Sequence, residues 1–344
     1  MNISRTYTKH FTLLIILLFL FLLLNISLGS VHIPISKIIS ILMNFGEPSK
    51  SSWDIIVIDY RLPKAITAIM VGSGLSISGL LMQTLFRNPL AGPFVLGISS
   101  GASLGVALFI LGSALFGSFW EAFIVSNWSI TIAASIGAFF VLSLIIIAAN
   151  KVRNTMSILI IGLMFGSLTS SVINVLSYLS EANKIQQYQY WSLGSLGNLT
   201  WSEILVFFIF YLISIVGTTL TIKPLNSLLL GENYAKSLGL NVELYRNIIL
   251  LITSLMTGVI TAFSGPIGFI GIATPHLAKI YFVSSNHKIL IPASAILGAI
   301  LLLICDCIAQ IPNSSFTLPI NAITSLFGAP VVIWLLIRKK KVYV

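Results

Sequence analysis

Few side chains in this sequence of 344 residues have catalytic chemistry, and their spacing forms no recognisable reaction centre. The four histidines lack the spacing of metal ligands, and no two carboxylates share an apolar segment. No phosphate loop of the type G-x-x-x-x-G-K-S/T occurs, so we do not expect the chain itself to bind ATP in that way. We therefore expect no catalytic residue, no metal site and no cofactor bound by this chain.

Asp306 is the acid that lies deep within an apolar run, between Cys305 and Cys307. An ionisable group inside a membrane segment is a candidate for a role in translocation or gating. The alternative, which we favour, is a structural acid that is hydrogen-bonded or ion-paired near the outer end of its helix. The two cysteines point in different directions on a helix, so a disulfide between them is not expected.

Arg61 and Lys64 stand at the start of the second apolar segment, next to Asp59. Cations at this place oppose the charge bias described below, which suggests that they are used. One interpretation is a docking contact with an acidic partner protein. The other is pairing with Asp59, and the sequence leaves both open.

The composition requires that lipid surrounds most of the chain. Hydrophobic residues make up 57% of the sequence and charged residues only 8%, whereas about 25% of a soluble domain is charged. The net charge of +10 does not indicate nucleic-acid binding, because the basic residues are scattered between apolar runs and form no basic face. We expect an all-α membrane protein with one polytopic transmembrane domain over residues 1–344 and no nucleic-acid partner.

Hydropathy predicts ten membrane spans, since a span needs about 20 mostly apolar residues. The third span begins in a glycine-rich stretch and could start several residues later. The eighth span is preceded by glycines and prolines, so it could be short or follow a bend. The predicted ranges are 11–30, 63–84, 93–116, 128–149, 156–178, 201–222, 247–264, 268–284, 289–309 and 319–337.

The lysines and arginines predict the orientation. If the N-terminus is cytoplasmic, the inside segments carry 14 of the 19 cations and the outside segments carry the other 5. Cytoplasmic loops are enriched in cations, so we expect both termini in the cytoplasm, which requires an even number of spans. The basic tail 338–341 is counted inside, and it is expected to meet anionic lipid headgroups.

The longest predicted inside connection, residues 223–246, is the most informative loop. Pro224 is expected to stop the sixth span, and Gly231 and Gly239 each stand where a short helix could end in a left-handed cap. We interpret residues of about 224–243 as two short helices on the cytoplasmic face. An ordinary amphipathic connector is the alternative that the residues alone favour.

A set of motifs, in a fixed order over residues 61 to 337, resembles the FecCD permease family. Any one of these motifs is weak, but their order is specific, and the resemblance covers nearly the whole chain. The motifs are Arg61-Leu-Pro-Lys64, Ser78-Gly-Leu-Leu-Met-Gln83, Arg87-Asn-Pro-Leu-Ala91, Leu96-Gly97, Ser100-Gly-Ala102, Leu230-Gly-Glu232, Ala235-Lys-Ser-Leu-Gly239, Gly265-Pro-Ile-Gly268, Pro275-His276, Asp306 and Gly328-Ala-Pro330.

The resemblance implies the permease architecture of a type II ATP-binding cassette importer in the bacterial inner membrane. It implies a second permease subunit, identical or a sister chain, two cytoplasmic ATPase subunits that use ATP, and a substrate-binding protein above. The path would run between the two permease subunits, with the fifth span as a wall. The short helices would sit in grooves of the ATPases, which reverses the preference for an ordinary connector.

The resemblance also assigns roles to residues. Arg61 and Lys64 would face acidic residues of the binding protein. The residues implied to couple the ATPases are Leu230, Gly231, Glu232, Ala235, Leu238 and Gly239. The candidates for translocation or gating are Gln83, Asn88, Pro89, Gly97, Gly101, Pro275, His276 and Asp306.

The chain departs from the family pattern near the ninth and tenth spans. Relatives usually carry arginine in place of Lys279 and of Gln310, and a glutamate motif where this chain has Thr317 and Asn321. Gln310 is expected to remove a partner of Asp306. These departures put the outer gate in doubt and leave the coupling loop untouched.

The leading functional hypothesis is an importer permease for a metal chelate, with ferric siderophore first and haem or cobalamin next. The alternative is a secondary transporter driven by an ion gradient, which would need buried charged coupling sites and has only Asp306 in its support. An integral-membrane enzyme lacks clustered catalytic groups.

Overall fold

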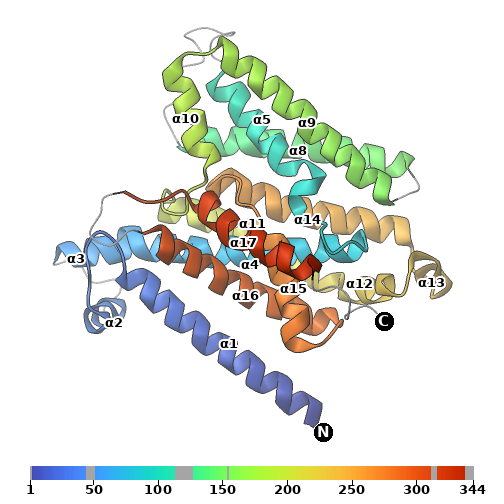
Figure 1. The fold of residues 1–344 in the computed structure, drawn as a ribbon, viewed down its shortest axis with the longest axis horizontal. Helices are drawn as coiled ribbons and strands as arrows, with labels where there is room; N and C mark the ends of the chain where they lie inside the picture. Colours follow the sequence, from blue (N-terminus) through green and yellow to red (C-terminus); the bar gives the residue numbers. More distant parts are fainter. Residues whose placement is uncertain (1, 44–50, 113–126, 153–154, 311–315, 338–344) are drawn as a thin grey trace. The chain divides into compact units, whose positions relative to one another are not determined.

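A computed structural model describes residues 2–43, 51–112, 127–152, 155–310 and 316–337, and helices dominate this part of the chain. Seven of the described helices are long and apolar enough to cross a membrane. The helices, shown in Figure 1, are α1 (Asn2–Ser27), α2 (Ile35–Met43), α3 (Ser52–Ile55), the π-helix η1 (Ile56–Arg61), α4 (Leu62–Leu85), the 3₁₀-helix η2 (Pro93–Leu96), α5 (Ile98–Ile110), α8 (Asn127–Lys151), α9 (Thr155–Leu179), α10 (Ala182–Ser192), α11 (Trp201–Leu220), α12 (Ile222–Leu229), α13 (Glu232–Ser237), α14 (Val242–Ser264), α15 (Ile270–Phe282), α16 (His287–Ala309) and α17 (Ile320–Ile337).

The chain divides into two compact units. Unit 1 comprises residues 1–77, 195–208 and 267–344, and unit 2 comprises residues 78–194 and 209–266. Each of the ten predicted spans overlaps a described helix, and the all-α membrane architecture is confirmed. The basic tail 338–341, which entered the orientation argument, lies outside the described residues.

Unit 1 is built around α16, which packs against α1, α15 and α17 (Figure 1). Small residues let α4 approach α16 closely: a Cβ added at Gly298 would lie 2.3 Å from the carbonyl oxygen of Gly72 and 1.9 Å from Oγ of Ser76. Small residues at such positions allow helix backbones to meet in lipid. Helices α4 and α16 are therefore fixed against each other by backbone contact.

Unit 2 is built around α5, which packs against α8 and α9, while α14 packs against α8 and α5 (Figure 1). The approach of α5 to α8 is again made by small residues. A Cβ added at Gly105 would lie 2.1 Å from the carbonyl oxygen of Ala133, and one added at Gly137 would lie 2.1 Å from that of Gly101. The two backbones therefore touch, and no side chain separates them.

The third predicted span, 93–116, begins later than its range, as its glycine-rich start suggested. Pro93 opens the short helix η2, and Gly97, with φ of 73°, separates η2 from α5. This left-handed residue breaks the helical path, because only glycine adopts it without strain. The helix α5 ends at Ile110, and the rest of the predicted range lies partly outside the described residues.

The sixth span ends four residues before Pro224, where the proline lacks the N–H that would bond the carbonyl of Leu220, as the prediction requires. Helix α11 ends at Leu220, and Pro224 lies in the first turn of α12. Proline is tolerated in a first helical turn because the N–H groups there have no intrahelical partner. The eighth span is short, as expected: α15 has 13 residues and follows the irregular stretch 265–269.

Three helical segments outside the predicted spans were not expected. Helix α2 and the α3–η1 stretch lie in the connection before α4, and α10 lies between the fifth and sixth spans. Each of these segments has fewer apolar residues or fewer turns than a span, so a window of span length does not detect it.

Candidate functional site

The connection between α11 and α14 contains the two predicted short helices, α12 and α13 (Figure 1). We call residues 222–239 the coupling segment. Its inward face is buried and is made of Pro224, Leu225, Leu228 and Ala235. Its other face carries exposed apolar side chains: Leu229, Leu230, Tyr234 and Leu238 are 37%, 63%, 51% and 59% exposed. Exposed apolar side chains of this kind are typical of a surface that faces another protein or the membrane.

Glycine is required at both predicted helix ends of the coupling segment. Gly231 has φ of 114° and ψ of 149°, and Gly239 has φ of 81°. L side chains rarely adopt these conformations. After α13 the N–H of Gly239 donates to the carbonyl of Lys236, and the N–H of Leu240 donates to that of Ala235. This pair of bonds is the Schellman arrangement, with glycine at its left-handed position.

Helix α4 ends by the same pair of bonds, but an arginine occupies the left-handed position. The N–H of Arg87 donates to the carbonyl of Thr84, the N–H of Asn88 donates to that of Gln83, and Arg87 has φ of 47°. A left-handed conformation costs an L residue roughly 1–2 kcal/mol. Nη2 of Arg87 donates to the carbonyl oxygen of Leu229 at 3.2 Å, at the C-terminus of α12.

Helix α14 continues the chain from the coupling segment and is tied to α8. The side chain of Asn241 accepts from the N–H of Leu244 and so caps the start of α14. Nη2 of the buried Arg246 donates to the carbonyl oxygen of Ala149 at 2.9 Å, in the last turn of α8. A cation near a helix C-terminus is favourable because the free carbonyls carry partial negative charge. Arg246 therefore holds the start of α14 against the end of α8.

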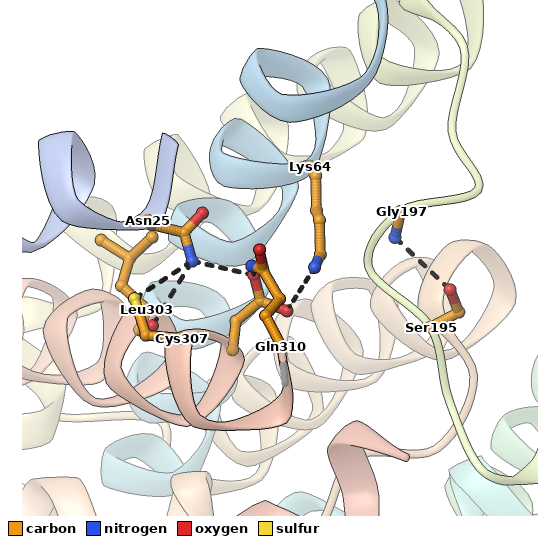
Figure 2. A network of polar contacts seen from close by, with 8 residues as sticks. Asn25, Lys64, Ser195, Gly197, Leu303, Cys307 and Gln310 are labelled. Carbon is orange, nitrogen blue, oxygen red and sulfur yellow. Dashed lines mark hydrogen bonds and ion pairs between the residues drawn. The ribbon is translucent and has the colours of Figure 1, made fainter. Parts of the chain in front are cut away.

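The second polar site lies in unit 1, around Asp306 of α16. Nζ of Lys64 lies 2.9 Å from Oδ1 of Asp306, and Oδ2 accepts from Nδ2 of Asn25 and from Nε2 of Gln310, both at 2.8 Å. Figure 2 shows Asn25, Lys64 and Gln310 converging on this part of α16 from α1, α4 and the end of α16 itself. We call these four residues the Asp306 cluster.

The Asp306 cluster contains the ion pair and hydrogen bonds that the structural interpretation of Asp306 expects. A buried carboxylate is stable when it is ion-paired and its oxygens accept hydrogen bonds, and both conditions hold here. Lys64 pairs with Asp306 and not with the exposed Asp59. Both oxygens of the Asp306 carboxylate are thus bonded within the chain. This weakens the case for a gradient-driven carrier, which has only Asp306 as a candidate coupling site.

The prediction that Gln310 removes a partner of Asp306 is wrong. Its amide is long enough to reach back one helical turn and donate to the carboxylate. Gln310 also pairs with Thr317, and the N–H of Leu318 donates to the carbonyl of Ala309 at 2.9 Å. The two ends of the α16–α17 connection are therefore held next to the Asp306 cluster.

Arg61 is turned into unit 1. Its guanidinium donates from Nη1 to the carbonyl oxygens of Ile26 and Ser27, at 2.8 and 2.9 Å, and from Nη2 to that of Val31. The residue is only 9% exposed. A Cβ at Gly29 would lie 2.7 Å from its Nη2, so this glycine leaves room for the guanidinium. Arg61 thus fixes the chain that leaves α1, and its charged group is not displayed on the surface.

The remaining gating candidates fall into separate structural roles. Gln83 and Asn88 make the end of α4, where Oδ1 of Asn88 accepts from the N–H of Leu90. Gly97 and Gly101 allow close packing on α9 and α8, since an added Cβ would lie within 3 Å of the carbonyl oxygens of Gly162 and Gly137. Pro89 follows Asn88 in unit 2, whereas Pro275 and His276 lie within α15 of unit 1.

The sequence did not single out three residues of these sites. Asn25 is a polar residue within the first apolar run, which is a signal that could have found it. Arg87 was noticed only as part of a motif, and Arg246 only as an inside cation. Within the described ranges, no group of three or more histidine, cysteine or acidic side chains could hold a metal ion.

Helix α9 is the fifth predicted span, and most of its surface is uncovered. Only 17% of its most apolar window is buried within the chain. The uncovered surface includes polar side chains of Ser167, Ser170, Ser171 and Asn174. The hydroxyls of Ser167 and Ser171 donate to carbonyl oxygens one turn earlier in α9, at 3.2 and 3.0 Å, so this surface is suited to face protein or water as well as lipid.

Comparison with known proteins gives consistent relatives over the whole chain. A sequence model of the FecCD transport family matches residues 16–338. The vitamin B12 import system permease protein BtuC of Salmonella typhi is 34% identical over 299 residues, which cover 86% of this chain and 88% of the relative. A Methanocaldococcus jannaschii protein named as an ABC transporter permease is 33% identical over 344 residues, 98% of this chain and 97% of the relative.

A solved structure has the same fold. It is an inward-facing conformation of an ABC transporter classed as metal-chelate type, and it matches with a TM-score of 0.83 at 27% identity. The match covers 96% of this chain and 99% of the solved chain.

Proposed function

The chain belongs to the FecCD transport family of ABC importer permeases, and from this premise we propose that it carries a metal chelate across the bacterial inner membrane by alternating access. A ferric siderophore is the proposed substrate, with haem and cobalamin as the next candidates. ATP is bound and hydrolysed by separate subunits. The chain itself performs no covalent chemistry.

The coupling segment carries this proposal. Its exposed Leu230, Tyr234 and Leu238 would enter grooves of two cytoplasmic ATPase subunits, where their apolar surface would be buried. Gly231, Glu232, Ala235 and Gly239 would shape the segment for this contact. The orientation that places it inside, with both termini cytoplasmic, is the one that the cation distribution supports.

The uncovered face of α9 supports a second permease subunit. Its polar side chains would line the path between two subunits, identical or sister chains, through which the chelate passes. Gln83, Asn88, Pro89, Gly97 and Gly101 of unit 2 and Pro275, His276 and Asp306 of unit 1 remain proposed contributors to gating.

A substrate-binding protein would dock on the outer face. The charged groups of Arg61 and Lys64 already bind carbonyl oxygens of this chain and the carboxylate of Asp306. The two residues would therefore support docking by positioning other parts of this chain. They would hold the outer ends of α1, α4 and α16 in the arrangement that the binding protein meets.

The substrate class draws support from the relatives. One relative is named for vitamin B12 import, and the matched transporter is classed as metal-chelate type. Uptake of a radiolabelled ferric hydroxamate, haem and cyanocobalamin by cells that express the chain with its neighbouring genes would separate the three. Uptake of cyanocobalamin alone would replace the siderophore proposal by cobalamin.

A pull-down tests the transporter class. The tagged chain is purified from native membranes in mild detergents, and the co-purifying proteins are identified by mass spectrometry. We expect an ATPase with a Walker motif in comparable molar amount. If no ATPase is recovered in several detergents, and uptake persists without ATP but stops when the proton gradient is abolished, the chain is a gradient-driven carrier.

A further inference from the structure

Two helix ends in unit 2 have the same backbone bonds but different residues at the left-handed position. After α13 that residue is Gly239, with φ of 81°, and after α4 it is Arg87, with φ of 47°. Glycine adopts this conformation without strain, whereas arginine does not. The backbone conformation at residue 87 therefore favours glycine. The presence of arginine at this position must be explained by the contacts of its side chain.

The guanidinium of Arg87 reaches the coupling segment. It donates to the carbonyl oxygen of Leu229, which is 142 residues away in the chain and lies at the C-terminus of α12. The last carbonyls of a helix lack intrahelical partners and attract cations. The bond thus joins the end of α4 to one end of the surface formed by Leu229, Leu230, Tyr234 and Leu238.

Gly231 makes room for this guanidinium. A Cβ added at Gly231 would lie 3.3 Å from Nη2 of Arg87, which is closer than side-chain carbon atoms usually come. Its φ of 114° excludes other residues without strain as well. The guanidinium of Arg87 therefore packs against Gly231, which directly follows the C-cap of α12. A side chain at position 231 would crowd this guanidinium.

We propose that Arg87 is a positioning residue that transmits movement of the coupling segment to the cytoplasmic end of α4. This rests on the proposed function, because the movement comes from the ATPase subunits. When they shift α12 and α13, the bond to Leu229 passes the displacement to the turn Arg87-Asn88. Arg246 provides the second connection, through α14 to α8. Arg87 contributes to transport by this connection and not by stabilising the fold.

Substitution by glycine separates the two roles of residue 87. Arg87→Gly removes the guanidinium and also removes the backbone strain, so the variant should melt at the same temperature as the wild type or higher. Arg87→Ala removes the guanidinium and keeps the strain. Arg87→Lys keeps a charge that can reach one carbonyl but not the planar donor group. Lys151→Ala, at the exposed end of α8, is the matched control that removes a cation elsewhere in unit 2.

The full transporter, purified with its ATPase and reconstituted in liposomes, provides the measurements. The probe is a ferric hydroxamate or cyanocobalamin, whichever the wild type takes up. For Arg87→Gly and Arg87→Ala we expect uptake per ATP hydrolysed to fall about tenfold, within the range of coupling between sites. Arg87→Lys should lie between these variants and the wild type, and Lys151→Ala should match the wild type.

Hydrogen exchange of residues 222–239 gives a readout that does not depend on transport. Both Arg87→Gly and Arg87→Ala should accelerate exchange there without lowering the melting temperature of the whole protein appreciably, and Arg87→Gly should melt at or above the temperature of Arg87→Ala. Unchanged exchange and unchanged uptake in Arg87→Gly would overturn the inference. Absence of ATP-dependent uptake in the wild type would instead overturn the proposed function.

Discussion

Arg61 and Arg87 lie before and after helix α4, and both donate to backbone carbonyls, but they do so in opposite ways. Arg61 is 9% exposed and donates to the carbonyl oxygens of the last two residues of α1 and of Val31, which follows α1. Arg87 is exposed and donates to one. Several buried bonds hold a group in one place, whereas a single exposed bond contributes less to the stability of the fold. The first contact is suited to fixing the chain and the second to movement.

The same contrast separates the Asp306 cluster from the coupling segment. In the cluster a buried carboxylate is satisfied by an ion pair and two hydrogen bonds within unit 1. In the coupling segment apolar side chains are left exposed. Substitutions in the cluster should therefore change folding stability, and substitutions in the segment should change partner binding. Four predictions, in order of decreasing effect, test this contrast.

Asp306→Ala should have the largest effect. It leaves the ammonium of Lys64 without its partner and two amides without an acceptor, and breaking a buried pair in this way costs about 3–5 kcal/mol. Unfolding by SDS in mixed micelles measures the loss. Adding Lys64→Met to Asp306→Ala should recover part of it, because no unpaired charge is then left. A loss below about 1 kcal/mol would show that the cluster is not a fixed element.

Arg61→Met should come next. Methionine keeps the length and apolar stem but leaves the carbonyls of Ile26 and Ser27 without their donor, which costs about 2–3 kcal/mol. The same SDS titration measures it, with Lys37→Met as a control at an exposed position. If binding-protein affinity fell while stability stayed at the wild-type value, Arg61 would contact the partner directly.

Leu230→Ser combined with Leu238→Ser should weaken ATPase recovery and leave the fold intact. These side chains are 63% and 59% exposed, so their removal costs little stability. A tenfold lower recovery of the ATPase corresponds to about 1.4 kcal/mol of binding. Full recovery of the ATPase with the double variant would move the docking surface away from the coupling segment.

Gly239→Ala should have the smallest effect, about 1 kcal/mol, from backbone strain alone. An added Cβ there meets no atom within 4 Å, so no clash adds to the cost. Gly239→Arg should have the same cost in stability but should abolish coupling, because its side chain would stand on the docking surface. Equal transport by the alanine and arginine variants would argue against that placement.

Much of the fold could be predicted from hydropathy, because lipid requires long apolar helices. The short segments α2 and α10 could not, since packing rather than length stabilises them. The left-handed cap at Gly239 was predicted correctly, because a helix end imposes a local backbone requirement, whereas Gly231, with φ of 114° and ψ of 149°, has a positive φ but is not left-handed. These are properties that neighbouring residues determine.

The contacts of the sites could not be predicted in the same way. The pairing of Lys64 with Asp306 and the bond from Arg87 to Leu229 join segments that are far apart in the chain. No local pattern specifies such a partner, so Asp59 was the nearest acid that the sequence offered for Lys64. The incorrect prediction for Gln310 shows a further limit of reasoning from sequence. A neutral amide can take the place of a charged donor to Asp306 when the geometry allows one hydrogen bond.

The close approach of α5 and α8 has a mechanical consequence. Their backbones touch at Gly101, Gly105, Ala133 and Gly137 without side chains between them, and interiors packed in this way resist deformation. Sliding of one helix along the other would drive carbonyl oxygens into the opposite backbone. We therefore expect the pair to move as one rigid body in the proposed alternating access, with the hinges of unit 2 elsewhere in the chain.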